Sequence, residues 1–82
     1  MPTEQYILSA LSSGRFIFTK HARERLEQRC ITRVDIMSCG RTASKAIDQG
    51  DGTYRVQGDD ESGDPLTVIC GYDGDTIVIT VF

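Results

Sequence analysis

The chain has 82 residues, with nine Lys or Arg, twelve Asp or Glu and one histidine, and its formal net charge is −3. This length predicts one domain over residues 1–82, and 39% hydrophobic residues exclude a disordered chain. No apolar run approaches the ~20 residues that span a bilayer. The N-terminus has no basic or apolar part of a secretion signal. We therefore expect a cytoplasmic protein with no membrane segment.

The first predicted elements are a helix and a short strand. Thr3 is a suitable N-cap for a helix over residues 4–12, and Gly14 is a suitable terminator. Residues 15–19 alternate between aromatic and other side chains, which predicts a brief strand. The short strand should therefore separate this first helix from the charged segment that follows.

Two further helices are predicted next. Thr19 or Lys20 begins a charged helix over residues 21–29. Thr32 and Asp35 have the spacing of a capping box, which predicts another helix that runs to Gly40. The N-terminal half of the chain is therefore mainly helical.

The second half is predicted to consist of strands separated by Asp-Gly turns and an acidic loop. The candidate strands are Thr42–Asp48, Thr53–Gln57, Leu66–Tyr72 and Thr76–Phe82. The apolar run Ile77–Ile79 predicts that the last strand is central and buried on both faces. The order of elements indicates an α+β fold, with N-terminal helices packed on one face of an antiparallel sheet. That sheet would combine the short early strand with a C-terminal meander of three to four strands.

The three cysteines are widely spaced and include no Cys-x-x-Cys pair, so we expect free thiols. The acidic stretch over residues 59–64 does not have the spacing of a calcium loop, and we interpret it as a solvated turn. No phosphate-binding glycine loop is present. The sequence therefore predicts no metal site and no cofactor.

Charge is distributed unevenly along the chain. Residues 1–41 have a net charge of +3, and residues 42–82 have a net charge of −6. Six of the nine bases lie between Arg15 and Arg33, together with the only histidine. The overall acidity argues against broad binding of polyanions, but this basic cluster is compatible with one small phosphate site.

The candidate catalytic residues are His21, Arg25, Arg29 and Arg55. His21 and Arg25 are one helical turn apart, and Arg29 follows a turn later. Guanidinium groups bind phosphate in a bidentate manner, and an imidazole transfers protons near neutral pH. These groups suit metal-free cleavage of RNA, with Arg55 approaching from a strand.

A structural interpretation of the same residues stays open. A charged helix with one histidine is usually a solvated surface, and Arg29 is placed to bond the last carbonyls of its helix. Arg55 is placed to be a cross-strand ion-pair partner. In this alternative the protein is a non-catalytic module that binds or regulates another protein.

The pattern His21-Ala22, Arg25-Leu26, Arg29, Ile31-Thr32 and Asp35-Ile36 resembles the signature of the domain of unknown function 4258 family. The resemblance continues through the strands and covers roughly residues 15–82. Cys30 departs from the pattern, because the family generally has glycine there. If this position needs a positive φ, Cys30 is strained.

The resemblance implies similarity to small bacterial toxins of the RelE and BrnT kind, which are ribonucleases with helices packed on an antiparallel sheet. It implies RNA as a substrate and a cognate antitoxin as a partner. By the same resemblance, His21, Arg25 and Arg29 match the polar motif of the family, and Arg55 matches a recurrent strand arginine. A homodimer formed through an unpaired sheet edge is a further expectation from the strand pattern.

Overall fold

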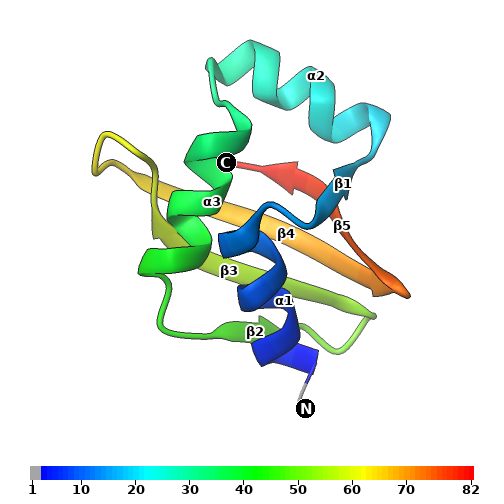
Figure 1. Ribbon diagram of the computed structural model, residues 1–82. Coiled ribbons are helices and arrows are strands. Elements are labelled where there is room, and N and C mark those ends of the chain that lie inside the picture. Colours follow the sequence, from blue (N-terminus) through cyan, green and yellow to red (C-terminus); the bar gives the residue numbers. More distant parts are fainter. Residues whose placement is uncertain (1–2) are drawn as a thin grey trace.

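The computed structural model describes residues 3–82, which form three helices and five strands (Figure 1). In chain order these are α1 (Thr3–Ser13), β1 (Phe16–Phe18), α2 (Lys20–Arg29), α3 (Arg33–Thr42), β2 (Ala46–Asp48), β3 (Thr53–Asp59), β4 (Pro65–Asp73) and β5 (Asp75–Val81). The predicted α+β class is confirmed.

The strands form one open sheet in the order β1-β5-β4-β3-β2. The strands from β2 to β5 are an antiparallel meander, as predicted, but β1 pairs with β5 in parallel. The prediction of a purely antiparallel sheet is therefore wrong, and the sheet is mixed. A parallel pair needs a long crossover between its strands, and the chain from α2 to β4 supplies it.

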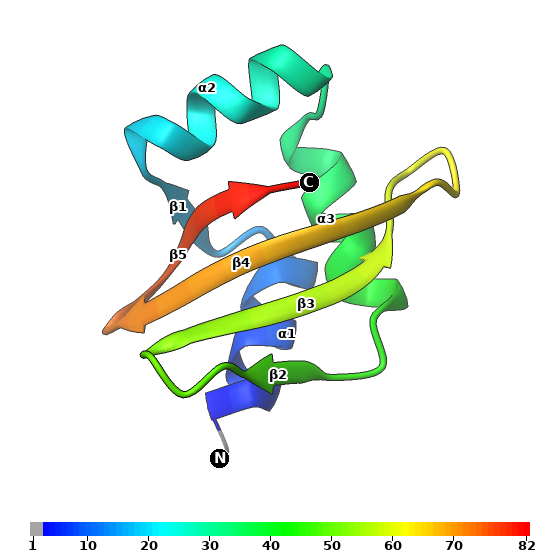
Figure 2. The ribbon, with the colours of Figure 1, turned by 180° about the vertical axis from the view of Figure 1, so that it is seen from behind.

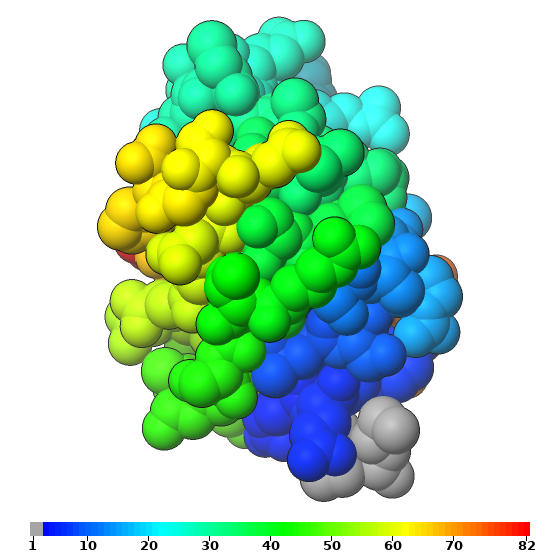
Figure 3. Space-filling model, turned by 60° about the vertical axis from the view of Figure 1, so that its left-hand side comes forward, coloured from blue at the N-terminus to red at the C-terminus, as the bar shows by residue number. Residues whose placement is uncertain are grey.

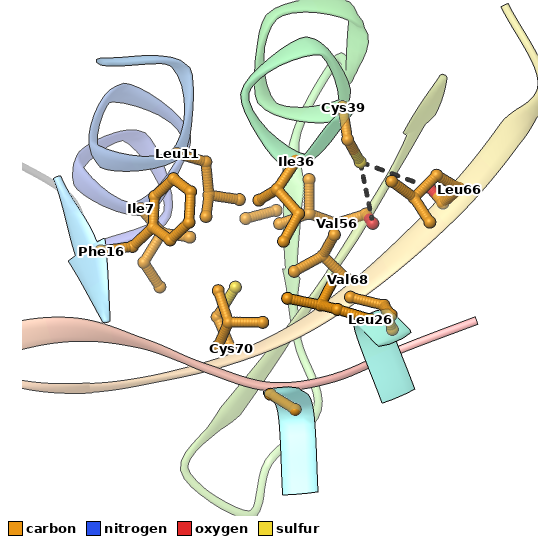
Figure 4. Close-up of a cluster of buried hydrophobic side chains, with 14 residues drawn as sticks. Ile7, Leu11, Phe16, Leu26, Ile36, Cys39, Val56, Leu66, Val68 and Cys70 are labelled. Atoms are coloured by element: carbon orange, nitrogen blue, oxygen red, sulfur yellow. Dashed lines mark hydrogen bonds between the residues drawn. The ribbon is translucent and has the colours of Figure 1, made fainter. Parts of the chain in front are cut away.

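Helices α1 and α3 lie side by side over one face of the sheet (Figures 1 and 2). Ile7 and Leu11 of α1 and Ile36 of α3 are fully buried against it. Strands β3, β4 and β5 contribute the facing valines, and α2 adds Ala22 and Leu26 to the same core (Figure 4). The predicted packing of helices on one face is thus confirmed.

The predicted helix ends are mostly observed. The Thr19 Oγ1 atom accepts a hydrogen bond from the Ala22 N–H at 3.0 Å, which caps α2. The Asp35 carboxylate accepts from the Thr32 N–H at 2.9 Å, which caps α3. Helix α3 continues past Gly40 to Thr42, so the strand predicted from Thr42 begins only at Ala46.

The reason for the longer helix is a tertiary contact. Thr42 Oγ1 donates to the Ser38 carbonyl at 3.0 Å and accepts from the Asp59 N–H at 2.8 Å. Its side chain therefore joins the last turn of α3 to the end of β3, and residue 42 stays helical despite the low helix propensity of threonine.

The second face of the sheet has no helix over it within residues 3–82, and we call it the open face (Figure 2). Strand β5 is an inner strand, as predicted, because β1 and β4 flank it. Its burial on both faces is not observed, since Ile77 and Ile79 on the open face are only partly buried. The apolar run over residues 77–79 therefore belongs to a strand with one covered face.

Candidate functional site

Three of the four predicted site residues lie on α2. His21 and Arg29 are exposed, and Arg25 is half-buried. Because residues four apart on a helix lie on one side, the three side chains follow a single stripe. Lys20 and Arg23 add two further exposed cations to the same helix. Helix α2 is therefore a basic surface with one imidazole.

Arg25 also contacts the sheet. Its Nη2 atom donates to the Val81 carbonyl at 3.5 Å, and Thr19 Oγ1 donates to the Ile79 carbonyl at 3.2 Å. Strand β1 pairs with β5 only as far as Val78, so these carbonyls belong to the part of β5 beyond that pairing. Arg25 and Thr19 thus attach α2 to the end of β5, as expected for a structural role of Arg25.

Arg55 lies apart from the other three predicted residues. It is in β3, and strands β4 and β5 lie between β3 and α2. Its neighbour Val56 is buried under the helices and Tyr54 packs against the same core, so Arg55 points to the open face. The structure brings His21, Arg25 and Arg29 together, and it does not bring Arg55 to them.

The open face carries an apolar patch, which the sequence analysis did not identify. The cross-strand pairs place alternate residues of each strand on this side. Thr67 and Phe82 exchange both backbone hydrogen bonds, which sets the Phe82 side chain on the same side as Thr67. The apolar members of the open face are Ile17, Ile47, Ile69, Ile77, Ile79 and Phe82.

Ile17 and Phe82 are the most exposed of these residues, at 52% and 51%. Gly71 leaves room on this side for Ile79, whose Cδ1 atom lies 3.4 Å from the position of a Cβ atom at residue 71. The signal in the sequence is the isoleucine at alternate positions of β5, a pattern that also fits burial on both sides. Exposed apolar patches of this kind on small proteins are often functional.

Arg55 stands among the isoleucines of the open face. Its cross-strand partners are Ile47 on β2 and Ile69 on β4. Its Nε atom is buried and has no hydrogen-bond partner. A buried donor without an acceptor costs about 1–3 kcal/mol, and more when the group is charged. The Nε–H group of the partly buried Arg55 therefore lacks an acceptor.

Acidic side chains lie at both ends of the open face. Asp73 and Asp75 are paired at the turn between β4 and β5, and Asp59 lies at the far end of β3. All three are exposed. The strands of the open face thus carry one cation, Arg55, with isoleucines on both sides of it and aspartates at the ends.

A shallow hollow of about 530 Å³ lies beside β1, between Tyr6, Arg15, Phe16 and Arg33. Arg33 Nη1 donates to the carbonyls of Gly14 at 2.9 Å and Phe16 at 3.3 Å. Its guanidinium also lies 4.5 Å from the centre of the Phe16 ring. Arg33 is therefore engaged in holding β1 against α3.

The cysteines are all free, as predicted; Cys39 and Cys70 are buried and Cys30 is exposed. Burial raises the pKa of Cys39 to about 11 and the pKa of Cys70 to about 12, so both stay protonated at neutral pH. Among residues 3–82 no three His, Cys, Asp or Glu side chains are grouped to hold a metal ion. No helix in this range is long and apolar enough to cross a membrane.

These features define a small α+β domain with a mixed five-stranded sheet, covered by helices on one face. The chain belongs to the family named Domain of unknown function (DUF4258), whose model matches residues 18–82. No match was found among the curated proteins or among the solved structures. The match confirms the resemblance to this family and leaves the function to be inferred from the site.

Proposed function

We propose that this protein is a non-catalytic protein-binding module and that the open face of its sheet is the binding surface. The observation that carries the proposal is the group of six apolar side chains on a sheet face that no other described element covers. A sheet that is apolar on both faces needs a layer on each side. A partner protein supplies the second layer.

The sheet edges are less suitable for binding than the open face. The edge strands β1 and β2 have three residues each, and such short edges offer few free backbone groups. A homodimer through a sheet edge stays a prediction, which sedimentation at high protein concentration tests. The absence of any dimer there would contradict it.

Photo-crosslinking in the native host tests the proposed function. A photoreactive phenylalanine analogue at position 69, on the open face, should form one discrete protein adduct that mass spectrometry identifies. The purified adduct protein should then bind the wild type at least tenfold more tightly than Ile69→Ser. The matched control is Val34→Ser, because Val34 is 47% exposed but lies on α3. Equal binding to all three proteins contradicts the proposal.

A second candidate function is that of a metal-independent ribonuclease, the toxin of a toxin–antitoxin pair. The observation that favours it is the stripe of His21, Arg25 and Arg29 on a helix with two more exposed cations. In this hypothesis His21 is the acid or base and Arg25 and Arg29 bind phosphate, whereas Arg55 lies too far along the sheet to join them. This hypothesis includes the similarity to toxins of the RelE and BrnT kind. It also includes a cognate antitoxin as the partner protein.

The ribonuclease hypothesis is tested with purified protein and total cellular RNA in the presence of EDTA. Cleavage by the wild type that is lost in His21→Ala and unchanged in Glu24→Ala supports it. Overexpression of the wild type should also arrest growth, and overexpression of His21→Ala should not. Intact RNA and normal growth with both proteins contradict it.

A further inference from the structure

We propose that an amphipathic helix of a partner protein covers the open face. The apolar stripe of this helix contains one carboxylate, and that carboxylate binds Arg55. This inference rests on the proposed function and specifies the partner. Arg55 is the only cation in the strands of the sheet within residues 3–82, and its Nε atom is buried without an acceptor.

The length of the open face suits a helix that lies along the strands. With strands about 4.8 Å apart and a rise of about 3.3 Å per residue, it measures roughly 20 Å by 20 Å. A helix of about 13 residues is roughly 20 Å long. Two helices, α1 and α3, lie side by side on the other face (Figure 1), so a single helix would cover about half of the open face.

The charges of the open face indicate what the helix carries. Arg55 lies between Ile47 and Ile69, so an Asp or Glu that reaches it must itself be flanked by apolar side chains. A guanidinium and a carboxylate form a bidentate pair that is strong when water is excluded. The acidic ends of the face, with Asp59, Asp73 and Asp75, favour basic residues towards the two ends of the helix.

The same charges argue against two other occupants. A second copy docked face to face about an axis that passes beside Arg55 would set two Arg55 side chains against each other. Like charges in an interface cost several kcal/mol. RNA would meet one arginine and three aspartates, and phosphate contacts require several cations. The carboxylate-bearing helix is the occupant that satisfies Arg55 and the isoleucines together.

A selection from displayed helical peptides tests this inference. The probe is a library of 20-residue peptides on an alanine-rich helical scaffold, randomised along one face. Peptides selected on the wild type should share one Asp or Glu in an apolar stripe. Peptides selected on Arg55→Glu should share Lys or Arg at that position. The control protein is Arg23→Glu, which has the same charge change on an exposed residue of α2.

The affinity of each selected peptide separates this inference from the proposed function. Peptides selected on the wild type should bind Arg55→Glu at least tenfold more weakly and Arg23→Glu equally well. If the peptides bind Ile69→Ser more weakly but bind Arg55→Glu as tightly as the wild type, the inference fails and the protein-binding function stands. If no selected peptide depends on Ile69, both fail.

Sedimentation of the purified protein completes the test. We expect no dimer that depends on the open face, so the wild type, Arg55→Glu and Ile69→Ser should sediment alike. A dimer that Ile69→Ser abolishes would make a second copy the occupant and overturn the inference. Circular dichroism and thermal unfolding of each variant confirm folding, which substitutions on the open face leave intact because they remove no core contact.

Discussion

Cys30 ends α2 with a left-handed backbone, at φ 55° and ψ 40°. The Ile31 N–H donates to the Leu26 carbonyl at 2.9 Å, which closes the helix in the usual Schellman manner. Glycine adopts this conformation without steric cost, whereas a Cβ atom makes it unfavourable. The strain expected from the family pattern at Cys30 is therefore confirmed.

Replacing Cys30 with glycine should stabilise the protein. We expect Cys30→Gly to raise the free energy of unfolding by about 0.5–1 kcal/mol, because the gain in backbone conformation exceeds the entropy that glycine adds to the unfolded chain. Urea denaturation measures the change. Cys30→Ala is the control and should show no such gain, since it keeps the Cβ atom. A gain of equal size in both variants would contradict the explanation.

Asp35 links α3 to the loop between β3 and β4. Its carboxylate accepts from the Thr32 N–H and, at 3.1 Å, from the Glu61 N–H. This loop lies against the start of α3 (Figure 3). The hydrogen bond from Thr32, followed by the bond from Glu61, lowers the pKa of Asp35, although desolvation partly opposes this.

A lowered pKa means that the ionised Asp35 stabilises the fold above its ordinary pKa of 3.8, and that this contribution is lost as the pH falls through the folded pKa. Asp35→Ala should therefore lower the free energy of unfolding by about 1–2 kcal/mol at pH 7, as for a lost helix cap. The loss should be smaller at pH 3. Urea denaturation at the two pH values tests this, with the exposed Glu24→Ala as control. A loss that does not change with pH would refute it.

At the level of secondary-structure elements, Gly40 determines how closely helices α1 and α3 pack against each other. A Cβ atom at Gly40 would lie 2.7 Å from Leu11 Cβ and 2.8 Å from the Ser12 backbone nitrogen. Neither atom is the end of a flexible side chain, so α1 would have to move. The two helices can therefore pack side by side only because residue 40 has no side chain (Figure 3).

We expect Gly40→Ala to destabilise the protein, which is the opposite of the usual effect of replacing glycine with alanine in a helix. Alanine normally stabilises a helix relative to glycine by about 1 kcal/mol. Here we expect the free energy of unfolding to fall by about 1–3 kcal/mol, because overpacking exceeds that gain. Thermal unfolding measures the change, and Ser38→Ala in the same helix is the control. A variant more stable than the wild type would show that α1 moves without cost.

The elements themselves were largely predictable from local signals. Thr19, Asp35 and Gly14 mark helix ends through their own side chain or backbone, so the helices were found with ends close to those observed. The strand predicted from Thr42 began four residues too early. Its true start depends on the contact between Thr42 and Asp59, which lie far apart in the chain.

The core of the whole molecule contains two buried thiols. Cys39 Sγ donates to the Leu66 carbonyl at 3.3 Å, which links α3 to β4. Desolvation is the main cause that raises the pKa of both Cys39 and Cys70, to about 11 and about 12. In the unfolded chain the same thiols ionise near their ordinary value of 9.0.

These thiols predict a loss of stability in alkali. A raised pKa stabilises the fold below the unfolded value, and this contribution is lost as the pH rises from about 9 through the folded values. The free energy of unfolding should fall by roughly 1 kcal/mol per pH unit for each thiol in this range. Urea denaturation at pH 8 and pH 10 measures the slope. The double variant Cys39→Ala and Cys70→Ala is the control, because its tyrosines and lysines still titrate in this pH range. An equal change of unfolding free energy with pH in the wild type and the double variant would contradict the prediction.

The candidate site was predictable in part. His21, Arg25 and Arg29 lie together because helical spacing alone places them, and spacing is visible in the sequence. The position of Arg55 relative to them depends on strand order, which no local pattern encodes. The open face escaped prediction for the same reason, because an apolar alternation does not say which side the helices cover.

The sequence by itself indicated the class of fold, most of the helix ends and the basic character of α2. Each depends on side chains within one or two turns of each other. Only the tertiary structure decided that β1 is parallel to β5, that Arg55 points away from the core, and that one sheet face is open. These features arise from pairing between distant segments, whose free energy is set by the packing of the whole core.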